Sequence, residues 1–267
     1  MRKIIVFLFL FCCQFVALAQ IEMLKEKEQI LKSLFWELED EEDDFAKAEI
    51  NQAIFDNLRE ALFDELSFEY PFDSLHNLGK VYSDDYALRF YTWNIERSDG
   101  SFLFYGFIQR LTGEKTLIPL IQSENAQLNL NRELNVKQWY GALYYKIVPI
   151  GTKKSPRYLL IGWRKNDIYS VNQKMADVLR FDKNGVVFGY NIFSTPKGMQ
   201  QRLVFNYCPD VQMSLRYDKT KKRIVYDHLV VVETENGNCP VPDFSYDAYV
   251  KKGKKWIHKS EVDAKND

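Results

Sequence analysis

Residues 86–111 read YALRFYTWNIERSDGSFLFYGFIQRL and contain two apolar, aromatic-rich runs on either side of Asp99-Gly100. An Asp-Gly pair between two such runs is typical of a β-hairpin. If these two residues form the turn, counting outward places Trp93 opposite Gly106. Both runs carry bulky apolar groups at odd and even positions, so we expect this strand pair to be covered on both faces.

Similar runs follow at intervals of about ten residues, and the turns between them are short and rich in lysine. This spacing predicts an antiparallel meander, arranged as a propeller-like array, a sandwich or a strongly bent sheet. The polar segment 125–137 predicts a loop or short helix between sheets and is a candidate surface-binding insertion. The further strand regions are residues 115–122, 139–150, 157–165, 176–182, 185–193, 202–208, 213–231 and 244–260.

The region before residue 71 has a different periodicity. Apolar residues recur at helical spacing over residues 21–38 and again, in steps of four, over residues 50–66, which predicts two amphipathic helices packed on each other or on the next module. Six consecutive acids at 39–44 lack the alternation and glycine of a calcium loop and predict a solvated turn before the second helix. We therefore expect an α+β fold: a helical segment over residues 20–70 and an antiparallel β domain over 71–267.

The first 19 residues have the features of a secretory signal peptide. Two basic residues precede an apolar run, and Ala17-Leu18-Ala19 forms a small-x-small cleavage site. Cleavage leaves 248 of the 267 residues, with 34 basic against 37 acidic side chains, a net charge of −3. That balance argues against nucleic acid as a partner. The remaining chain has no apolar run of membrane-spanning length, so we expect a soluble periplasmic or secreted protein.

Only Cys208 and Cys239 remain after cleavage. In an oxidising compartment two such cysteines are expected to form a disulfide, and the alternative is a pair of buried thiols. The closed loop of about 32 residues would contribute roughly 3.5–4 kcal/mol to stability in the chain-entropy model.

The sequence contains few signs of catalytic chemistry. Asp227-His228 is the one Asp-His neighbour pair, but it falls in a predicted strand, where adjacent side chains point to opposite faces. The pair is therefore not expected to act as a dyad, although either residue could join partners from neighbouring strands. No metal-ligand spacing, nucleophile elbow or cofactor-binding glycine loop occurs, so we expect no metal and no cofactor.

The chain resembles a group of secreted β-rich proteins of the Bacteroidota that have no assigned activity. The resemblance covers roughly residues 80–260 and is carried by LLIGWRKND, FDKNGVVFG, RLVFNYCPDVQMSLRYDKTKKRIVYDHLVV and PDFSYDAYVKKGKKW. It implies an exported protein and says nothing about mechanism. The residues within these segments that we select as candidate binding residues are Trp163, Asp227, His228, Asp243 and Tyr246.

Three functional hypotheses remain from the sequence. The first is a non-catalytic binding protein of the cell envelope, whose partner is another envelope protein or a glycan. The second is a hydrolase of an envelope or dietary polymer, which needs two carboxylates about 5–10 Å apart in a cleft and no local motif. The third is a carrier that holds a small ligand in a cavity within the sheet.

Overall fold

The computed structural model describes residues 2–111, 117–123, 129–166, 171–183, 185–234 and 237–264, with side chains from residue 18 onward except that of residue 166. The side chains of residues 1–17, which include the basic and apolar parts of the predicted signal peptide, lie outside this set, as do residues 125–128 of the predicted insertion. The chain forms two compact units, which are described separately. The first comprises Met1–Leu78 with Gln109–Ile118, and the second comprises Gly79–Ile108 with Pro119–Asp267.

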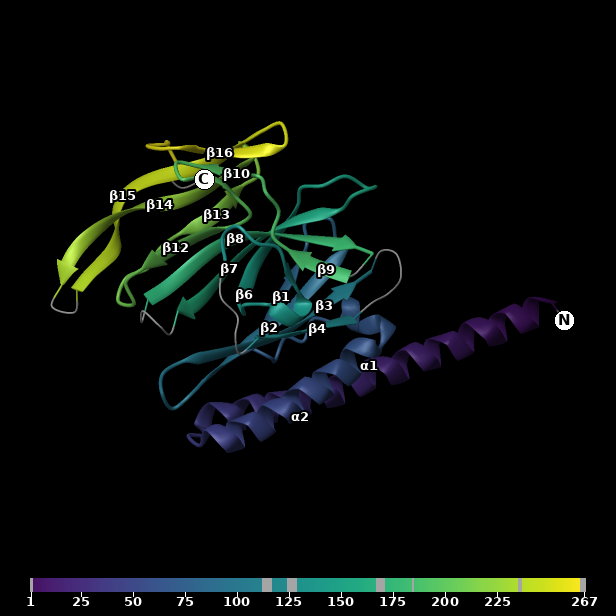
Figure 1. Cartoon of the computed structure of the whole chain (residues 1–267). Helices are drawn as coiled ribbons and strands as arrows, with labels where there is room; N and C mark the ends of the chain where they lie inside the picture. Colours follow the sequence, from purple (N-terminus) through teal and green to yellow (C-terminus); the bar gives the residue numbers. More distant parts are fainter. Residues whose placement is uncertain are drawn as a thin grey trace. The chain divides into compact units, whose positions relative to one another are not determined.

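The first unit contains the predicted helical hairpin, formed by α1 (Arg2–Asp40) and α2 (Asp44–Phe63) (Figure 1). The acidic run supplies the link between them, and the Asp43 carboxylate caps α2 by accepting the Ala46 N–H at 2.8 Å. A short 3-10 helix, η1 (Glu65–Phe68), follows. The apolar stripes of the two helices are buried as predicted, at Leu24, Leu31, Phe35, Leu38, Ile54, Leu58 and Leu62.

Four strands form an antiparallel-rich sheet that contains the 86–111 hairpin: β1 (Gly79–Tyr82), β2 (Leu88–Glu96), β3 (Phe102–Arg110) and β4 (Leu117–Ile121). The hairpin is confirmed, but the predicted register is wrong by one residue. The Gly100 N–H donates to Arg97 O, and the Arg97 N–H donates to Ser101 O, so the turn has three residues instead of two. Gly100 takes the left-handed φ of 76° that this turn requires. Gly106 consequently lies against the backbone of Tyr91 and Thr92 and not opposite Trp93.

Two six-stranded sheets make up the rest of the second unit (Figure 1). One has the order β11-β10-β16-β15-β14-β13 and the other the order β5-β9-β8-β7-β6, with β12 paired to β8. All pairs with a described register are antiparallel except β10 with β16. The remaining strands are β5 (Leu134–Asn135), β6 (Leu143–Pro149), β7 (Arg157–Asn166), β8 (Val171–Asp182), β9 (Gly185–Phe188), β10 (Phe193–Thr195), β11 (Gly198–Gln200), β12 (Leu203–Tyr207), β13 (Leu215–Asp218), β14 (Arg223–Thr234), β15 (Gly237–Lys252) and β16 (Lys255–Lys259).

The two six-stranded sheets share one hydrophobic core, as in a sandwich. Its members come from both sheets, for example Leu159 on β7, Val178 on β8 and Trp256 on β16. Of the three predicted arrangements, this packing supports the sandwich. The described part of segment 125–137 contains the short strand β5, which pairs with β9 and was not predicted, and the first two residues of the 3-10 helix η2 (Val136–Gln138), so the prediction of a loop or short helix is only partly correct.

The predicted hairpins within 213–231 and 244–260 are joined by a third, unpredicted hairpin of β14 and β15, whose pairing runs from Arg223 opposite Val250 to Thr234 opposite Gly237. The predicted disulfide is confirmed: Cys239 on β15 is bonded to Cys208, which follows β12. The Cys208 N–H also donates to Pro240 O at 2.9 Å. These links hold the outer part of the hairpin against the end of β12.

Candidate functional site

The pairing of β14 with β15 is interrupted at His228. Asp227 lies opposite Tyr246, whereas Leu229 lies opposite Pro242, so His228 alone faces three residues of β15, numbers 243–245. Such a bulge redirects side chains and is frequent beside functional sites. We call residues 243–245 the Phe244 bulge.

The Phe244 bulge presents an aromatic ring to solvent. The side chain of Phe244 is 95% exposed, and its backbone has a φ of 68°, in the left-handed region that non-glycine residues rarely adopt. The Asp243 carboxylate accepts hydrogen bonds from the Ser245 N–H at 3.0 Å and the Ser245 hydroxyl at 2.7 Å. These bonds lower the pKa of Asp243 and fix the turn in which the ring is displayed.

Beside the bulge, the carboxylate of Asp247 on β15 contacts side chains of both neighbouring strands, β14 and β16. Oδ2 of Asp247 lies 3.0 Å from His228 Nδ1, 3.3 Å from His258 Nε2 and 3.5 Å from the Tyr226 hydroxyl that donates to it. Oδ1 accepts the backbone N–H of Glu261 at 3.0 Å. We call Tyr226, His228, Asp247 and His258 the Asp247 cluster.

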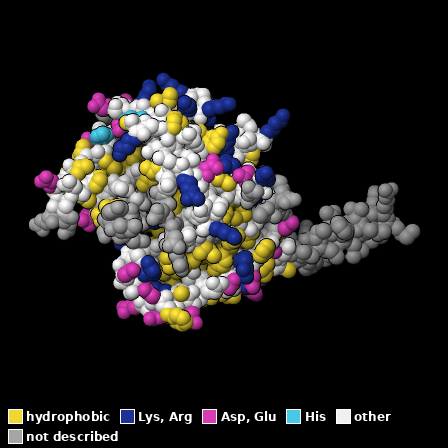
Figure 2. Space-filling model, viewed as in Figure 1, with side chains coloured by type: hydrophobic (Ala, Val, Ile, Leu, Met, Phe, Trp, Pro, Cys, Tyr) yellow, Lys and Arg dark blue, Asp and Glu magenta, His cyan; other side chains and the backbone are white. Residues whose placement is uncertain are grey.

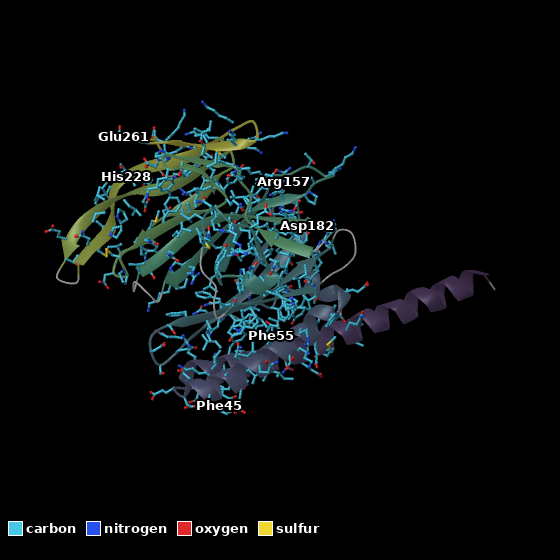
Figure 3. All side chains as sticks on the ribbon, viewed as in Figure 1. Phe45, Phe55, Arg157, Asp182, His228 and Glu261 are labelled. Carbon is cyan, nitrogen blue, oxygen red and sulfur yellow. A yellow bond between two sulfur atoms is a disulfide. The ribbon has the colours of Figure 1, made fainter. Side chains whose placement is uncertain are left out.

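Strand alternation explains why these residues meet. Tyr226 lies directly opposite Asp247, and His228 follows Tyr226 by two positions, so all three share one face of the sheet. His258 reaches the same face from β16, where it lies opposite Tyr249. The cluster therefore occupies the face that packs on the core, at its margin, and Figure 3 shows His228 and Glu261 at this end of the sheet.

Burial and hydrogen bonding determine the charge states in the cluster. Burial raises the pKa of Asp247, but the hydrogen bonds from His228, the Glu261 N–H and His258 outweigh it and hold the pKa below its ordinary value. The hydrogen bond to Asp247 raises the pKa of His228, with further contributions from the charges of Asp243 and Glu261. The cluster thus favours a carboxylate paired with an imidazolium.

Aromatic rings pack around the residues of the Asp247 cluster. The Tyr226 and Tyr249 rings are stacked at 5.9 Å, and Tyr249 lies 5.4 Å from the His258 ring. Phe205 on β12 packs on Tyr226 at 4.3 Å. Burial raises the pKa of Tyr249 to about 12. Since the side chains of His228 and Asp247 are 41% and 7% exposed, the cluster presents the imidazole to solvent and buries its partner.

Two of the five predicted site residues lie at this site. His228 belongs to the Asp247 cluster, and Asp243 belongs to the Phe244 bulge. Asp227 points to the other face, where its carboxylate accepts the Ser214 N–H at 2.7 Å. The prediction that Asp227 and His228 do not form a dyad is confirmed, since β14 is a strand and each has a different partner. Tyr246 is on the face of Asp227 and packs beside Val225, Ala248 and Ala264.

Trp163 lies elsewhere in the second unit. It is on β7, and its ring makes edge contacts with Phe102 at 6.2 Å and Phe104 at 6.3 Å. The structure therefore does not bring Trp163 together with His228 and Asp243 at one site.

Sequence reasoning missed Asp247 and His258 as site residues. They are separated from His228 by 19 and 30 positions in the chain, so no local spacing joins them. Strand alternation gave no signal either, because Asp247 shares its face of the strand with Ser245 and Lys251, a pattern typical of a polar face directed to solvent. Pairing the two hairpins in register would have been needed to identify the partners of Asp247.

Neither a protein-family model, a curated protein nor a solved structure matches the chain. Among the described residues, no three His, Cys, Asp or Glu side chains are placed to bind a metal ion together. No helix in the described ranges has an apolar stretch long enough to cross a bilayer. What the protein does is therefore inferred from the geometry around Phe244 and Asp247.

Proposed function

We propose that the protein is a non-catalytic binding protein of the cell envelope that contacts its partner, an envelope protein or a glycan, through the Phe244 bulge and the exposed ring of His228. The observation that carries this proposal is that Phe244 combines a left-handed backbone with an almost fully exposed ring in the bulge that faces the partly exposed His228. A left-handed backbone costs an L-residue about 1–2 kcal/mol. Glycine would avoid that cost, and a ring that is 95% exposed recovers almost none of it through intramolecular packing. Strain of this kind is characteristic of functional positions.

The surroundings of Phe244 suit a contact surface. Exposed aromatic rings on rigid supports contribute strongly to binding, because little conformational entropy is lost on association. The Asp243 and Ser245 hydrogen bonds hold the backbone of the bulge, and the adjacent Asp247 cluster fixes the His228 ring. Asp243 supplies an acceptor and His228 a donor for polar groups of the partner.

The pKa shifts at this site favour binding over the hydrolase alternative. Glycoside hydrolysis needs one carboxyl with a raised pKa, which donates a proton to the leaving group. The pKa values of Asp243 and Asp247 are both lowered, so both groups are ionised at neutral pH. His228 has a raised pKa, so less of its imidazole is unprotonated near neutrality and free to act as a general base.

Two features support a periplasmic or secreted location. Residues 1–19 have the pattern of a cleaved signal peptide, and the Cys208–Cys239 bond is typical of oxidising compartments. The resemblance to secreted Bacteroidota proteins points the same way. Sequencing the amino terminus of the purified protein tests this part, and we expect it to begin at Gln20. An amino terminus at residue 1 or 2 in the exported fraction would contradict signal cleavage.

The binding proposal is tested with Phe244→Gly. Glycine relieves the left-handed strain and removes the ring, so the variant should be as stable as the wild type or slightly more stable, while its binding is weakened. Tyr86→Gly is a matched control, because Tyr86 is also an aromatic residue with a positive φ, 55°, and is 62% exposed.

The assay combines pulldown from solubilised envelope and glycan fractions with crosslinking from a photoreactive residue at position 244 or 86. We expect position 244 to crosslink one defined species, and Phe244→Gly to weaken its binding about tenfold or more. Tyr86→Gly should bind as the wild type does. Equal binding by wild type and Phe244→Gly, or turnover of a polymer without a stable complex, would overturn the proposal.

A further inference from the structure

Two lysine-rich turns meet at the end of the sheet away from the Phe244 bulge. Arg223, at the start of β14, lies opposite Val250 near the end of β15, so the β13–β14 and β15–β16 turns are neighbours. The Lys251 N–H donates to Lys222 O at 3.3 Å and joins the two turns directly. We call the set the lysine end, and its members are Lys219, Lys221, Lys222, Lys251, Lys252, Lys254 and Lys255.

All seven side chains of the lysine end are exposed. Residues 219–222 and 251–255 contain no acid, so neither turn supplies its own counter-charge. Asp218, which immediately precedes the first turn, is buried and accepts a hydrogen bond from Arg223 Nε at 2.8 Å. Figure 2 shows dark-blue side chains gathered along the upper margin of this view, over the region of β16. A protein whose net charge is close to zero therefore concentrates positive charge at one end.

The chemistry of the turns indicates the kind of anion that they fit. Lysine is a flexible point charge without the fork geometry by which arginine grips a single carboxylate or phosphate. The non-lysine positions of the two turns are Thr220 and Gly253, and the nearby Trp256 is buried. Because the described residues 218–223 and 250–256 expose no aromatic ring that could stack on bases or insert between lipid tails, we expect contact through these turns to be electrostatic.

We propose that the lysine end adsorbs to a membrane surface that contains anionic phospholipids. A flat array of phosphate headgroups suits seven mobile ammonium groups on two adjacent hairpin tips, and each lysine near such a surface strengthens adsorption about fivefold. Lys251 and Phe244 are seven positions apart on β15, roughly 23 Å along the strand. Adsorption at the lysine end would therefore leave the Phe244 bulge free for its own partner.

Vesicle co-sedimentation tests the proposal with the naturally processed protein. The probes are phosphatidylcholine–phosphatidylglycerol vesicles and pure phosphatidylcholine vesicles. We expect binding to the anionic vesicles alone, with a strong decrease as salt is raised from about 0.1 M to about 0.5 M, since screening weakens exposed charges. Binding to neutral vesicles to the same extent would overturn the proposal.

The variant replaces Lys251, Lys252, Lys254 and Lys255 by glutamine, and we expect it to lose about 100-fold or more of its partitioning into anionic vesicles. The matched control replaces four exposed lysines elsewhere in the second unit by glutamine and changes the net charge equally. Equal losses in both variants would show a net-charge effect and refute the lysine end as the site. Binding to heparin or nucleic acid without binding to vesicles would assign it to another polyanion and refute it too. The control positions are Lys153, Lys154, Lys183 and Lys197.

Discussion

Replacing Asp247 by asparagine tests whether the Asp247 cluster is an ion pair that orders this end of the sheet. Asparagine keeps the shape of the side chain but removes the charge that His228 and His258 contact. It also leaves one acceptor oxygen where the carboxylate has two, and its amide group is a donor directed at other donors.

The expected loss can be worked out from the contacts. A hydrogen bond to a charged group contributes about 1.5–3 kcal/mol when buried. The side chains of His228 and His258 are 41% and 24% exposed, so their contributions fall towards about 1 kcal/mol or less each. The loss of the charged acceptor for the Glu261 N–H adds about 1 kcal/mol. We expect a total of about 2–3 kcal/mol, which lowers Tm by about 5–10 °C for a chain of this size.

The loss should depend on pH. The folded-state pKa of His228 is raised, so its stabilising effect is complete below about pH 6.5 and is lost as pH rises through the folded-state pKa. The folded-state pKa of Asp247 is lowered, so its effect is present above about pH 4 and is lost as pH falls through the folded-state pKa. The difference between wild type and Asp247→Asn should therefore be largest between about pH 4 and 6.5.

The measurements are urea unfolding at several pH values and an NMR titration of the His228 ring. The His228 pKa should lie above about 6.5 in the wild type and return towards that value in Asp247→Asn. Asp227→Asn is the control, because Asp227 is adjacent to His228 in the sequence, but its side chain points to the opposite face of the sheet and accepts a hydrogen bond from the Ser214 N–H. The reasoning would be refuted if the His228 pKa were unchanged in Asp247→Asn, or if Asp227→Asn lowered the His228 pKa as much as Asp247→Asn does.

Three further predictions concern stability. Replacing both Cys208 and Cys239 by serine should lower the free energy of unfolding by about 3.5–4 kcal/mol, because the disulfide closes a loop with a sequence separation of 31. Reducing the disulfide of the wild type should have the same effect. An unchanged midpoint of urea unfolding would contradict this prediction. Asp177→Ala should lower the free energy of unfolding by about 3–5 kcal/mol, because it leaves the fully buried guanidinium of Arg202, 2.9 Å away, without its carboxylate. The surface change Lys197→Gln should alter the free energy of unfolding by no more than about 0.5 kcal/mol. Comparable urea midpoints for the two variants would contradict a stabilising role of the buried pair. Leu58→Ala should lower the free energy of unfolding by about 2–5 kcal/mol, because Leu58 is fully buried. Phe63→Ala should lower it by less than about 0.5 kcal/mol, because Phe63 is on the same helix but 71% exposed. Similar shifts in Tm for both variants would show that the helical hairpin is not packed as described.

Much of the local structure was predictable because it depends on neighbours in the chain. The apolar period near four identified both helices, and the period of two identified most strands from residue 86 onward. The two cysteines that follow the predicted signal peptide identified the disulfide. Alternation along β14 is enough to place Asp227 and His228 on opposite faces of the sheet.

Register was less predictable, because different turns can use the same residues. Asp99-Gly100 fits a two-residue hairpin turn and also the three-residue turn that forms, since both place glycine at positive φ. A one-residue difference in the loop changes every pairing along β2 and β3. The hydrogen bonds of Arg97 decide between the two turns.

The sequence by itself determined both helices, most strands and their apolar faces, because these follow from the 3.6-residue and two-residue periods of the backbone, and it determined the cysteine pair because only two cysteines follow the predicted signal peptide. Only the tertiary structure decided that His228 and His258 meet at Asp247, that the two six-stranded sheets share a core, and that Phe244 adopts a left-handed conformation in solvent. These features depend on pairing between residues far apart in the chain. No local pattern encodes that pairing, because strand register and sheet packing are set by the combined burial of all the strands.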